Sequence, residues 1–112
     1  MKTFEKTAAQ GDVFFERIRK LPDGVLEVPA EGGFVIVAHS ETGHHHVMDR
    51  NAVTMYRSPE EIYECFLVIK EPATLEHQRP FDTHESIQFA PGIYRARRQR
   101  EYVPEGFRRV ED

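Results

Sequence analysis

The sequence of 112 residues predicts a single all-β domain, a small barrel or jelly roll that spans residues 1–112. Short segments rich in aromatic and β-branched residues recur along the chain, and turn signals containing Gly or Pro separate them. No long stretch shows the i, i+3, i+4, i+7 apolar spacing of an amphipathic helix. We expect residues 1–10 to form a flexible arm and residues 104–112 a tail.

The first half of the chain contains five predicted strands, each bounded by turn signals. They cover residues 13–18, 25–28, 34–38, 44–48 and 52–56. Residues 21–24 mark a turn, because they contain Pro, Asp and Gly, and residues 31–33 mark another, because they contain two glycines. The run from Phe34 to Ala38 is continuously apolar. That pattern predicts a strand covered on both faces, the most buried in the protein.

The second half begins with a helix signal and continues with strands. Ser58 suits a helix N-cap and Pro59 the first helical position, so we expect at most one short helical turn there. The predicted strands cover residues 65–69, 73–77, 86–89 and 93–103. In the last of these strands, Tyr94, Ala96 and Tyr102 are expected on one side.

Charge and cysteine usage narrow the class of protein. The formal net charge is −4, so the chain as a whole is no obvious polyanion binder. The single cysteine, Cys65, excludes an intramolecular disulfide, which fits a reducing compartment. The N-terminus lacks the apolar run of a signal peptide, and Cys65 to Ile69 is too short to cross a membrane. We therefore expect a cytoplasmic protein without a membrane partner; a homo-oligomer is compatible with the composition.

The histidines are concentrated in two segments. Four of the six lie within residues 38–48, and the other two are His77 and His84. Side chains alternate across a strand, so His44 and His46 are expected on one face, roughly 7 Å apart. If the two segments lie side by side, four imidazoles can converge on one ion. The predicted metal ligands are His44, His46, His77 and His84.

The predicted ion is a divalent transition metal, with Zn as the first candidate and Fe, Mn or Ni as alternatives. Four histidines would fill a tetrahedral site and make the metal structural, whereas three would leave a position open for hydrolytic or oxidative chemistry. Glu76 and Glu85 each adjoin one of these histidines and are the candidate catalytic proton carriers. The sequence leaves both alternatives open, and with them the question of an enzyme and its small-molecule substrate.

The His44-x-His46 pair, on a predicted strand that begins at Gly43, resembles the metal motif of the cupins. In that family a Gly-rich strand carries His-x-His, a Glu follows a few residues later, and a further His comes from a second motif. The resemblance implies a jelly-roll barrel with a central metal, to which His77 or His84 would supply the later histidine. The Glu of the motif has no counterpart at its expected place in this sequence.

An Arg-rich segment supports a second class of function. Residues 93–109 contain six arginines and two glutamates, which gives this segment a charge of +4. Arg binds phosphate through paired hydrogen bonds and Tyr stacks on bases, so strand 94–102 is a candidate contact for nucleic acid or a protein partner. The candidate residues are Arg95, Arg97, Arg98, Arg100 and Tyr102. The alternative interpretation is an edge strand whose charges prevent aggregation and pair with the acidic residues of the chain.

Overall fold

The computed structural model describes residues 2–3, 7–10, 13–38, 45–61, 63–77, 86–98, 100–103 and 106–109. This part of the chain is all-β, as predicted, and contains no helix. At the predicted helix signal there is a turn instead, in which the backbone N–H of Glu61 donates to the carbonyl of Ser58 at 3.3 Å. No described segment forms a helix that could cross a membrane.

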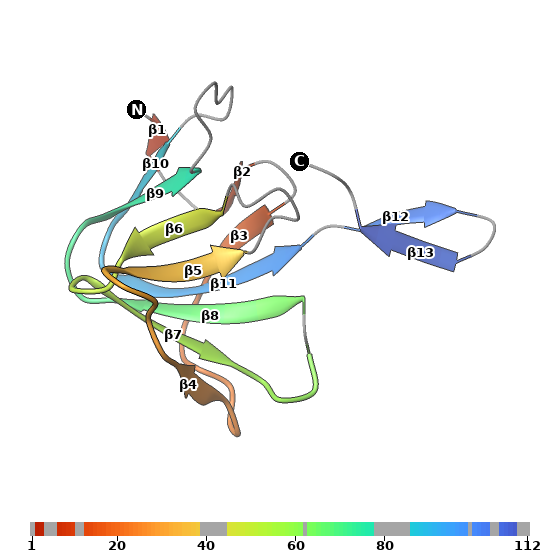
Figure 1. The fold of residues 1–112 in the computed structure, drawn as a ribbon, viewed down its shortest axis with the longest axis horizontal. Helices are drawn as coiled ribbons and strands as arrows, with labels where there is room; N and C mark the ends of the chain where they lie inside the picture. The colour runs from red at the N-terminus through yellow and green to blue at the C-terminus, as the bar shows by residue number, and fades with distance from the viewer. Residues whose placement is uncertain are drawn as a thin grey trace.

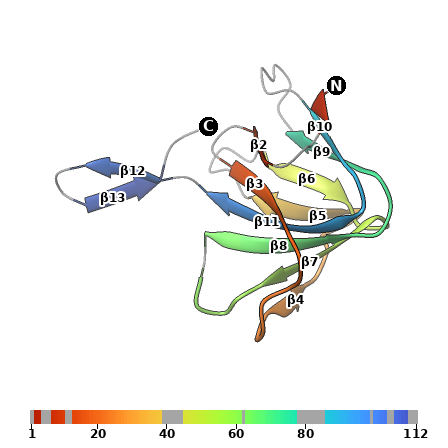
Figure 2. The same ribbon diagram turned by 180° about the vertical axis from the view of Figure 1, so that it is seen from behind.

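The described residues form thirteen strands, which belong to two larger sheets and one hairpin. The strands are β1 (Lys2–Thr3), β2 (Thr7–Gln10), β3 (Val13–Ile18), β4 (Leu26–Val28), β5 (Phe34–Ala38), β6 (His46–Asp49), β7 (Val53–Arg57), β8 (Glu64–Ile69), β9 (Ala73–His77), β10 (Ile87–Phe89), β11 (Gly92–Arg98), β12 (Arg100–Val103) and β13 (Gly106–Arg109). One sheet has the order β1-β10-β9-β6-β5, and the other has the order β2-β3-β11-β8-β7-β4. Figures 1 and 2 show these two sheets as the layers of a sandwich, from which the β12–β13 hairpin extends. Of the two folds that the sequence left open, the structure therefore has the layered form, with no closed barrel among the described strands.

The core lies between the two sheets and follows the two-residue alternation of the strands. Every second residue of the long strands is buried there, and the residues between them face outward. The core-face residues are Val13, Phe15, Val35, Val37, Met48, Val53, Met55, Cys65, Leu67, Ile69, Ala73, Leu75, Ile87, Phe89, Tyr94 and Ala96. From this alternation we can assign each polar residue on these strands to the core face or to the outer face of its sheet.

The prediction that residues 34–38 form the most buried strand was wrong. In the structure β5 is the edge strand of its sheet, and Phe34 is 41% exposed. β8 is a strand buried on both faces, and its outward Phe66 is only 3% exposed and lies 6.0 Å from the guanidinium of Arg95. A continuous apolar run in the sequence does not distinguish an edge strand from a strand buried on both faces. The aliphatic part of a Lys or Arg side chain can cover an apolar residue on the outer face, so a second layer of structure is not required.

The single strand predicted over residues 93–103 is two strands in the structure. β11 lies in the core sheet between β3 and β8, whereas β12 pairs only with β13, with Val103 opposite Gly106. The partner of β12 lies a few residues further along the chain, so a local hairpin takes the place of a longer ladder. Residue 102 therefore belongs to a different sheet from residues 94 and 96, and the prediction that the three share one side of a single strand was wrong.

The segments at the two ends of the chain contain strands. Residues 7–10 lie in the segment expected to be an arm, and there they form β2, which pairs with β3 and buries Ala8. Residues 106–109 lie in the expected tail and form β13. Both expectations rested on low hydrophobicity, yet backbone pairing with an existing strand does not require apolar side chains on both faces.

The connections between consecutive strands from β5 to β11 differ in length at the two ends of the sandwich. Three connections at one end are short and cover residues 50–52, 70–72 and 90–91. Those that join β5 to β6, β7 to β8 and β9 to β10 at the other end are longer and cover residues 39–45, 58–63 and 78–86. We call the first the closed end and the second the open end. The closed end is tied together by a backbone hydrogen bond of 2.9 Å from Lys70 to Ala52.

Candidate functional site

The structure brings two of the predicted metal ligands opposite one another at the open end. β6 and β9 are antiparallel neighbours, and their register pairs His46 with His77. His46 is fully buried and lies two residues before core residue Met48, so it is on the core face. His77 follows the core residues Ala73 and Leu75 by the same alternation and therefore occupies a core-face position. The predicted juxtaposition of the two histidine segments is present at this pair.

The other two predicted ligands, His44 and His84, lie outside the described residues, as does Glu85. The described residues that precede these two segments in the sequence, Ala38 and His77, lie at the open end. Among the described residues there is no group of three or more His, Cys, Asp or Glu side chains that could hold a metal. The four-histidine site therefore stays a prediction.

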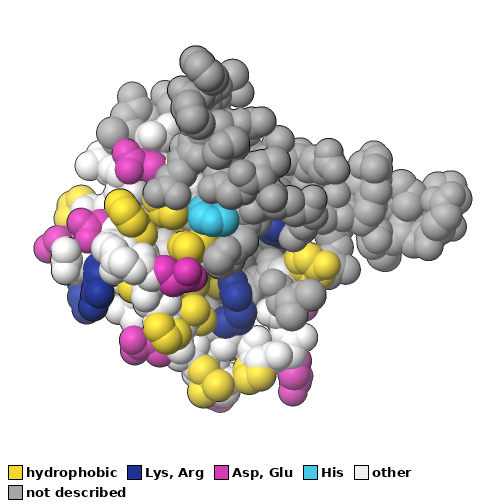
Figure 3. Space-filling model, in the orientation of Figure 1, with side chains coloured by type: hydrophobic (Ala, Val, Ile, Leu, Met, Phe, Trp, Pro, Cys, Tyr) yellow, Lys and Arg dark blue, Asp and Glu magenta, His cyan; other side chains and the backbone are white. Residues whose placement is uncertain are grey.

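Glu76, a candidate proton carrier, lies on the opposite face of the sheet from His46. It pairs in register with Val47, and its side chain is exposed on the outer face. A shallow hollow on that face is lined by Phe34, Asp49 and Glu76 among others. Figure 3 shows hydrophobic and acidic side chains mixed over this side of the molecule. The described part of the chain does not bring Glu76 to the core-face histidines.

A cavity of about 200 Å³ lies between the sheets at the open end. Its apolar lining is Val13, Val37, Ala38, Cys65 and Ala96. Its polar lining includes Arg57, Tyr63 and Arg98. Because Ala38 is the register partner of His46, the cavity adjoins the histidine pair.

The arginines of this cavity continue core-face rows of apolar residues. Arg57 follows Val53 and Met55 at two-residue spacing on β7, and Arg98 follows Tyr94 and Ala96 in the same way on β11. The backbone N–H of Arg98 donates to the carbonyl of Tyr63 at 2.9 Å, which fixes this end of β11 against β8. On these two strands the core-face residues are apolar in the middle of the strand and are arginines at the open end.

The Cys65 thiol lies on β8 between these two rows. Burial raises its pKa from 9.0 to about 11, although the charge of Arg57 and a hydrogen bond with that guanidinium act in the opposite direction. The thiol also contacts the carbonyl oxygen of Val37, with Sγ 3.7 Å away. It is therefore protonated and unreactive at neutral pH.

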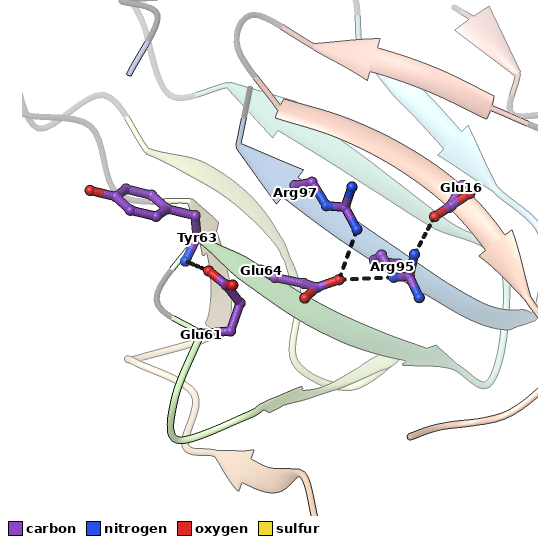
Figure 4. Close-up of polar contacts among 6 residues, drawn as sticks. All are labelled: Glu16, Glu61, Tyr63, Glu64, Arg95 and Arg97. Carbon is purple, nitrogen blue, oxygen red and sulfur yellow. Dashed lines mark hydrogen bonds and ion pairs between the residues drawn. The ribbon is translucent and has the colours of Figure 1, made fainter. Parts of the chain in front are cut away.

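Two arginines of the Arg-rich segment are held in ion pairs on the outer face of β11. Arg95 Nη1 lies 2.7 Å from Glu16 Oε1, and Arg95 Nε lies 2.9 Å from Glu64 Oε1. Arg97 Nη2 lies 3.3 Å from the same Glu64 oxygen. Figure 4 shows the cluster, in which Glu64 lies between the two guanidinium groups. The alternative interpretation of this segment, an edge strand whose charges pair with acidic residues, agrees with the ion pairs of Arg95 and Arg97 but was wrong about the edge, because β11 lies between β3 and β8.

Sequence reasoning missed Arg57 and Tyr63. Arg57 did carry a signal, because it extends the apolar alternation of residues 53 and 55 by one more step. An arginine at such a position either ends the buried row or faces a cavity, and only the neighbouring strands decide between these outcomes. Tyr63 lies in the connection before β8 and had no periodic signal.

The fold and the site define an all-β sandwich domain with a cavity and a buried histidine at one end. Residues 9–99 match the model of a family described as "Domain of unknown function (DUF8820)", and the chain belongs to this family. The matched range runs from β2 to the end of β11, so it includes the described residues of the site and excludes the β12–β13 hairpin. Neither the curated proteins nor the solved structures yielded a match.

Proposed function

We propose that this protein binds a divalent transition metal at the open end of the sandwich through His46 and His77, with His44 and His84 as the further ligands. The observation that supports the proposal is the register pairing of His46 with His77 on the core face. Residues directly opposite on antiparallel strands have Cβ atoms roughly 5 Å apart, so two imidazoles there can reach one ion. The resemblance of the His44-x-His46 motif to the cupin motif supports the same proposal.

The chemistry of the donors favours Zn, with Fe, Mn or Ni as alternatives, because imidazole nitrogen suits all of these ions. A bound metal of this kind would lower the pKa of a coordinated water or polarise a substrate oxygen. That chemistry requires an open position, and hence three histidine ligands rather than four. Glu85 is the preferred proton carrier of the proposal, since Glu76 lies on the outer face.

The metal content of untagged, full-length protein, purified without nickel or chelators, tests this proposal. We expect about one equivalent of metal by elemental mass spectrometry and a lower Tm after EDTA treatment. Protein that carries no metal, takes up none on titration and melts at the same temperature with EDTA would overturn it. The identity of the metal then indicates whether hydrolytic or oxidative substrates should be screened.

Substitutions of two histidines locate the site. His77→Gln should lose the metal, whereas His45→Gln should retain it, because His45 precedes β6 and is not part of the register pair. Full metal content in His77→Gln would contradict the proposed ligand set. His84→Gln provides a second variant, for which the same loss of metal is expected.

A second candidate is a non-enzymatic binding module that contacts nucleic acid or a protein partner. It is supported by the β12–β13 hairpin, whose register places Arg100 opposite Arg109 and Tyr102 opposite Phe107. These two register pairs contain two arginines and two aromatic residues, and residues of these types suit phosphate contacts and base stacking. Arg100→Ala should weaken salt-dependent binding of a single-stranded oligonucleotide without changing metal content. His77→Gln should have the reverse effects, so the two candidates are separable.

A further inference from the structure

Two arginines at the open end occupy core-face positions, which along the rest of their strands hold apolar side chains. Arg57 and Arg98 end the core-face rows of β7 and β11, and both line the cavity between the sheets. A surface arginine could extend into water without costing stability, but these two lie along the inner face of the sandwich. Their position therefore requires a reason beyond solubility.

The surroundings of Arg57 leave its charge uncompensated within the described part of the chain. No ion pair among the described residues involves Arg57, whose side-chain contact is with the neutral thiol of Cys65. Its Nε atom is buried and has no hydrogen-bond acceptor among these residues. A buried donor left in this state lowers the stability of the folded chain. An oxyanion bound in the cavity would recover that loss.

The other charged residues that the structure describes around the cavity do not supply this anion. Glu64 is the acidic residue of the lining, and its Oε1 already lies within 3.3 Å of both Arg95 and Arg97 on the outer face. The other lining groups are largely apolar, with Val13, Val37 and Ala96 toward the core. The cavity thus combines a cationic side with an apolar side.

We propose that this cavity binds a small carboxylic acid, with the carboxylate against Arg57 and Arg98 and the apolar body against Val13, Val37 and Ala96. A guanidinium matches a carboxylate through two parallel hydrogen bonds. The volume of about 200 Å³ exceeds the roughly 30 Å³ of one water several times, which suits a short acyl chain. The apolar wall favours such a ligand over inorganic phosphate, which would leave that wall without contacts. The proposal rests on the arginines and not on the metal.

Binding should be measured on full-length protein treated with EDTA, so that metal coordination cannot contribute. The probes are butanoate and its uncharged analogue butanamide, followed by calorimetry and by backbone amide shifts in two-dimensional NMR. We expect butanoate to bind and to shift the amides of Val37, Cys65 and Ala96, and butanamide to bind at least about tenfold more weakly, the loss of one charge-assisted hydrogen bond. Equal binding of the two probes, or tighter binding of phosphate, would overturn the proposal.

Variants then test whether the arginines are responsible. Arg57→Gln and Arg98→Gln should each weaken butanoate binding about tenfold or more, and Arg57→Lys should retain part of the affinity because it keeps the charge. Arg19→Gln is the matched control, since Arg19 is exposed and is not part of the cavity lining. Unchanged affinity in both cavity variants would exclude this site. Failure of the metal proposal alone would leave these results unaffected, because no metal is present in the assay.

Discussion

The closed and open ends of the sandwich are stabilised by different kinds of contact. At the closed end, Phe89 packs edge-on against Phe15 and Tyr94, with ring centroids 5.3 and 5.0 Å apart. The Tyr94 hydroxyl donates to the carbonyl of Ala90 at 2.7 Å, and Arg17 Nη2 donates to the carbonyl of Pro91 at 2.8 Å. The closed end thus combines packed aromatic rings with polar groups that are hydrogen-bonded, as is usual in a stable core.

At the open end the same core faces end in charged and polar side chains in place of apolar ones. Arg57 and Arg98 face the cavity on one sheet, and the buried His46 lies at the corresponding end of the other sheet. Sites that bind ligands commonly retain such charges at a cost in stability. We therefore infer that the closed end contributes most of the stability and that the open end binds ligands. Four predictions, on substitutions and on pH, test this difference.

The largest expected effect is the loss of an aromatic ring at the closed end. Phe89 is fully buried and contacts two other rings, so Phe89→Ala should lower the free energy of unfolding by about 3–5 kcal/mol. Urea denaturation of the wild type and the variant measures the difference. A loss below about 1 kcal/mol would show that the aromatic cluster is not the centre of stability.

The buried thiol should make stability depend on alkaline pH. The pKa of Cys65 is about 11 in the folded chain and 9.0 in the reference state, so the unfolded chain loses its proton first as the pH rises. The stabilisation is complete below pH 9 and is lost through about pH 11, by roughly 2–3 kcal/mol. Denaturation of wild type and Cys65→Ala from pH 8 to 11 isolates this contribution. Parallel curves for the two proteins would contradict it.

A smaller loss is expected from Gly92→Ala at the closed end. Gly92 has φ +156°, and an added Cβ would lie 2.8 Å from Arg17 Nη2. Both the backbone conformation and the displaced guanidinium should lower the free energy of unfolding, by about 1–2 kcal/mol. Gly33→Ala is the control, because nothing lies within 4 Å of its Cβ position. Equal stability of the two variants would refute the strain at residue 92.

The smallest effect has the opposite sign. Arg57→Met removes the uncompensated charge and keeps most of the volume, so the free energy of unfolding should rise by about 0.5–1 kcal/mol. Arg17→Met at the closed end should instead be destabilising, because Arg17 donates to Pro91 and lies over the Tyr94 ring at 5.7 Å. Both are measured by thermal unfolding. Destabilisation by Arg57→Met would mean that this arginine contributes to the fold.

Much of the fold followed from local sequence patterns. β3, β5 and β9 have the predicted limits, because alternating or β-branched runs are bounded by turn residues. The edge position of β5 and the division between β11 and β12 did not follow, since both depend on which strands become neighbours. Pairing across the sheet is a long-range property that a single sequence does not encode locally.

For the candidate site, too, only some of the residues could be predicted from the sequence. The identity of His46 and His77 as a pair could be proposed from composition and alternation, and the register agrees for these two residues. Glu76 directly precedes His77 on β9, and adjacent residues of a strand face opposite sides, so its position on the outer face could have been predicted. The alternation of residues 53, 55 and 57 could have placed Arg57 on the core face, but not beside a cavity, because strands of both sheets line that cavity.

The uneven distribution of connection lengths also affects how this domain can be altered. Residues 39–45, 58–63 and 78–86 can change in length or composition without shifting a ladder register, since each joins strands whose pairing continues toward the closed end. The two- and three-residue turns at the closed end allow no such freedom. The sandwich is thus a scaffold on which new recognition loops can be grafted at one end, while folding is specified at the other.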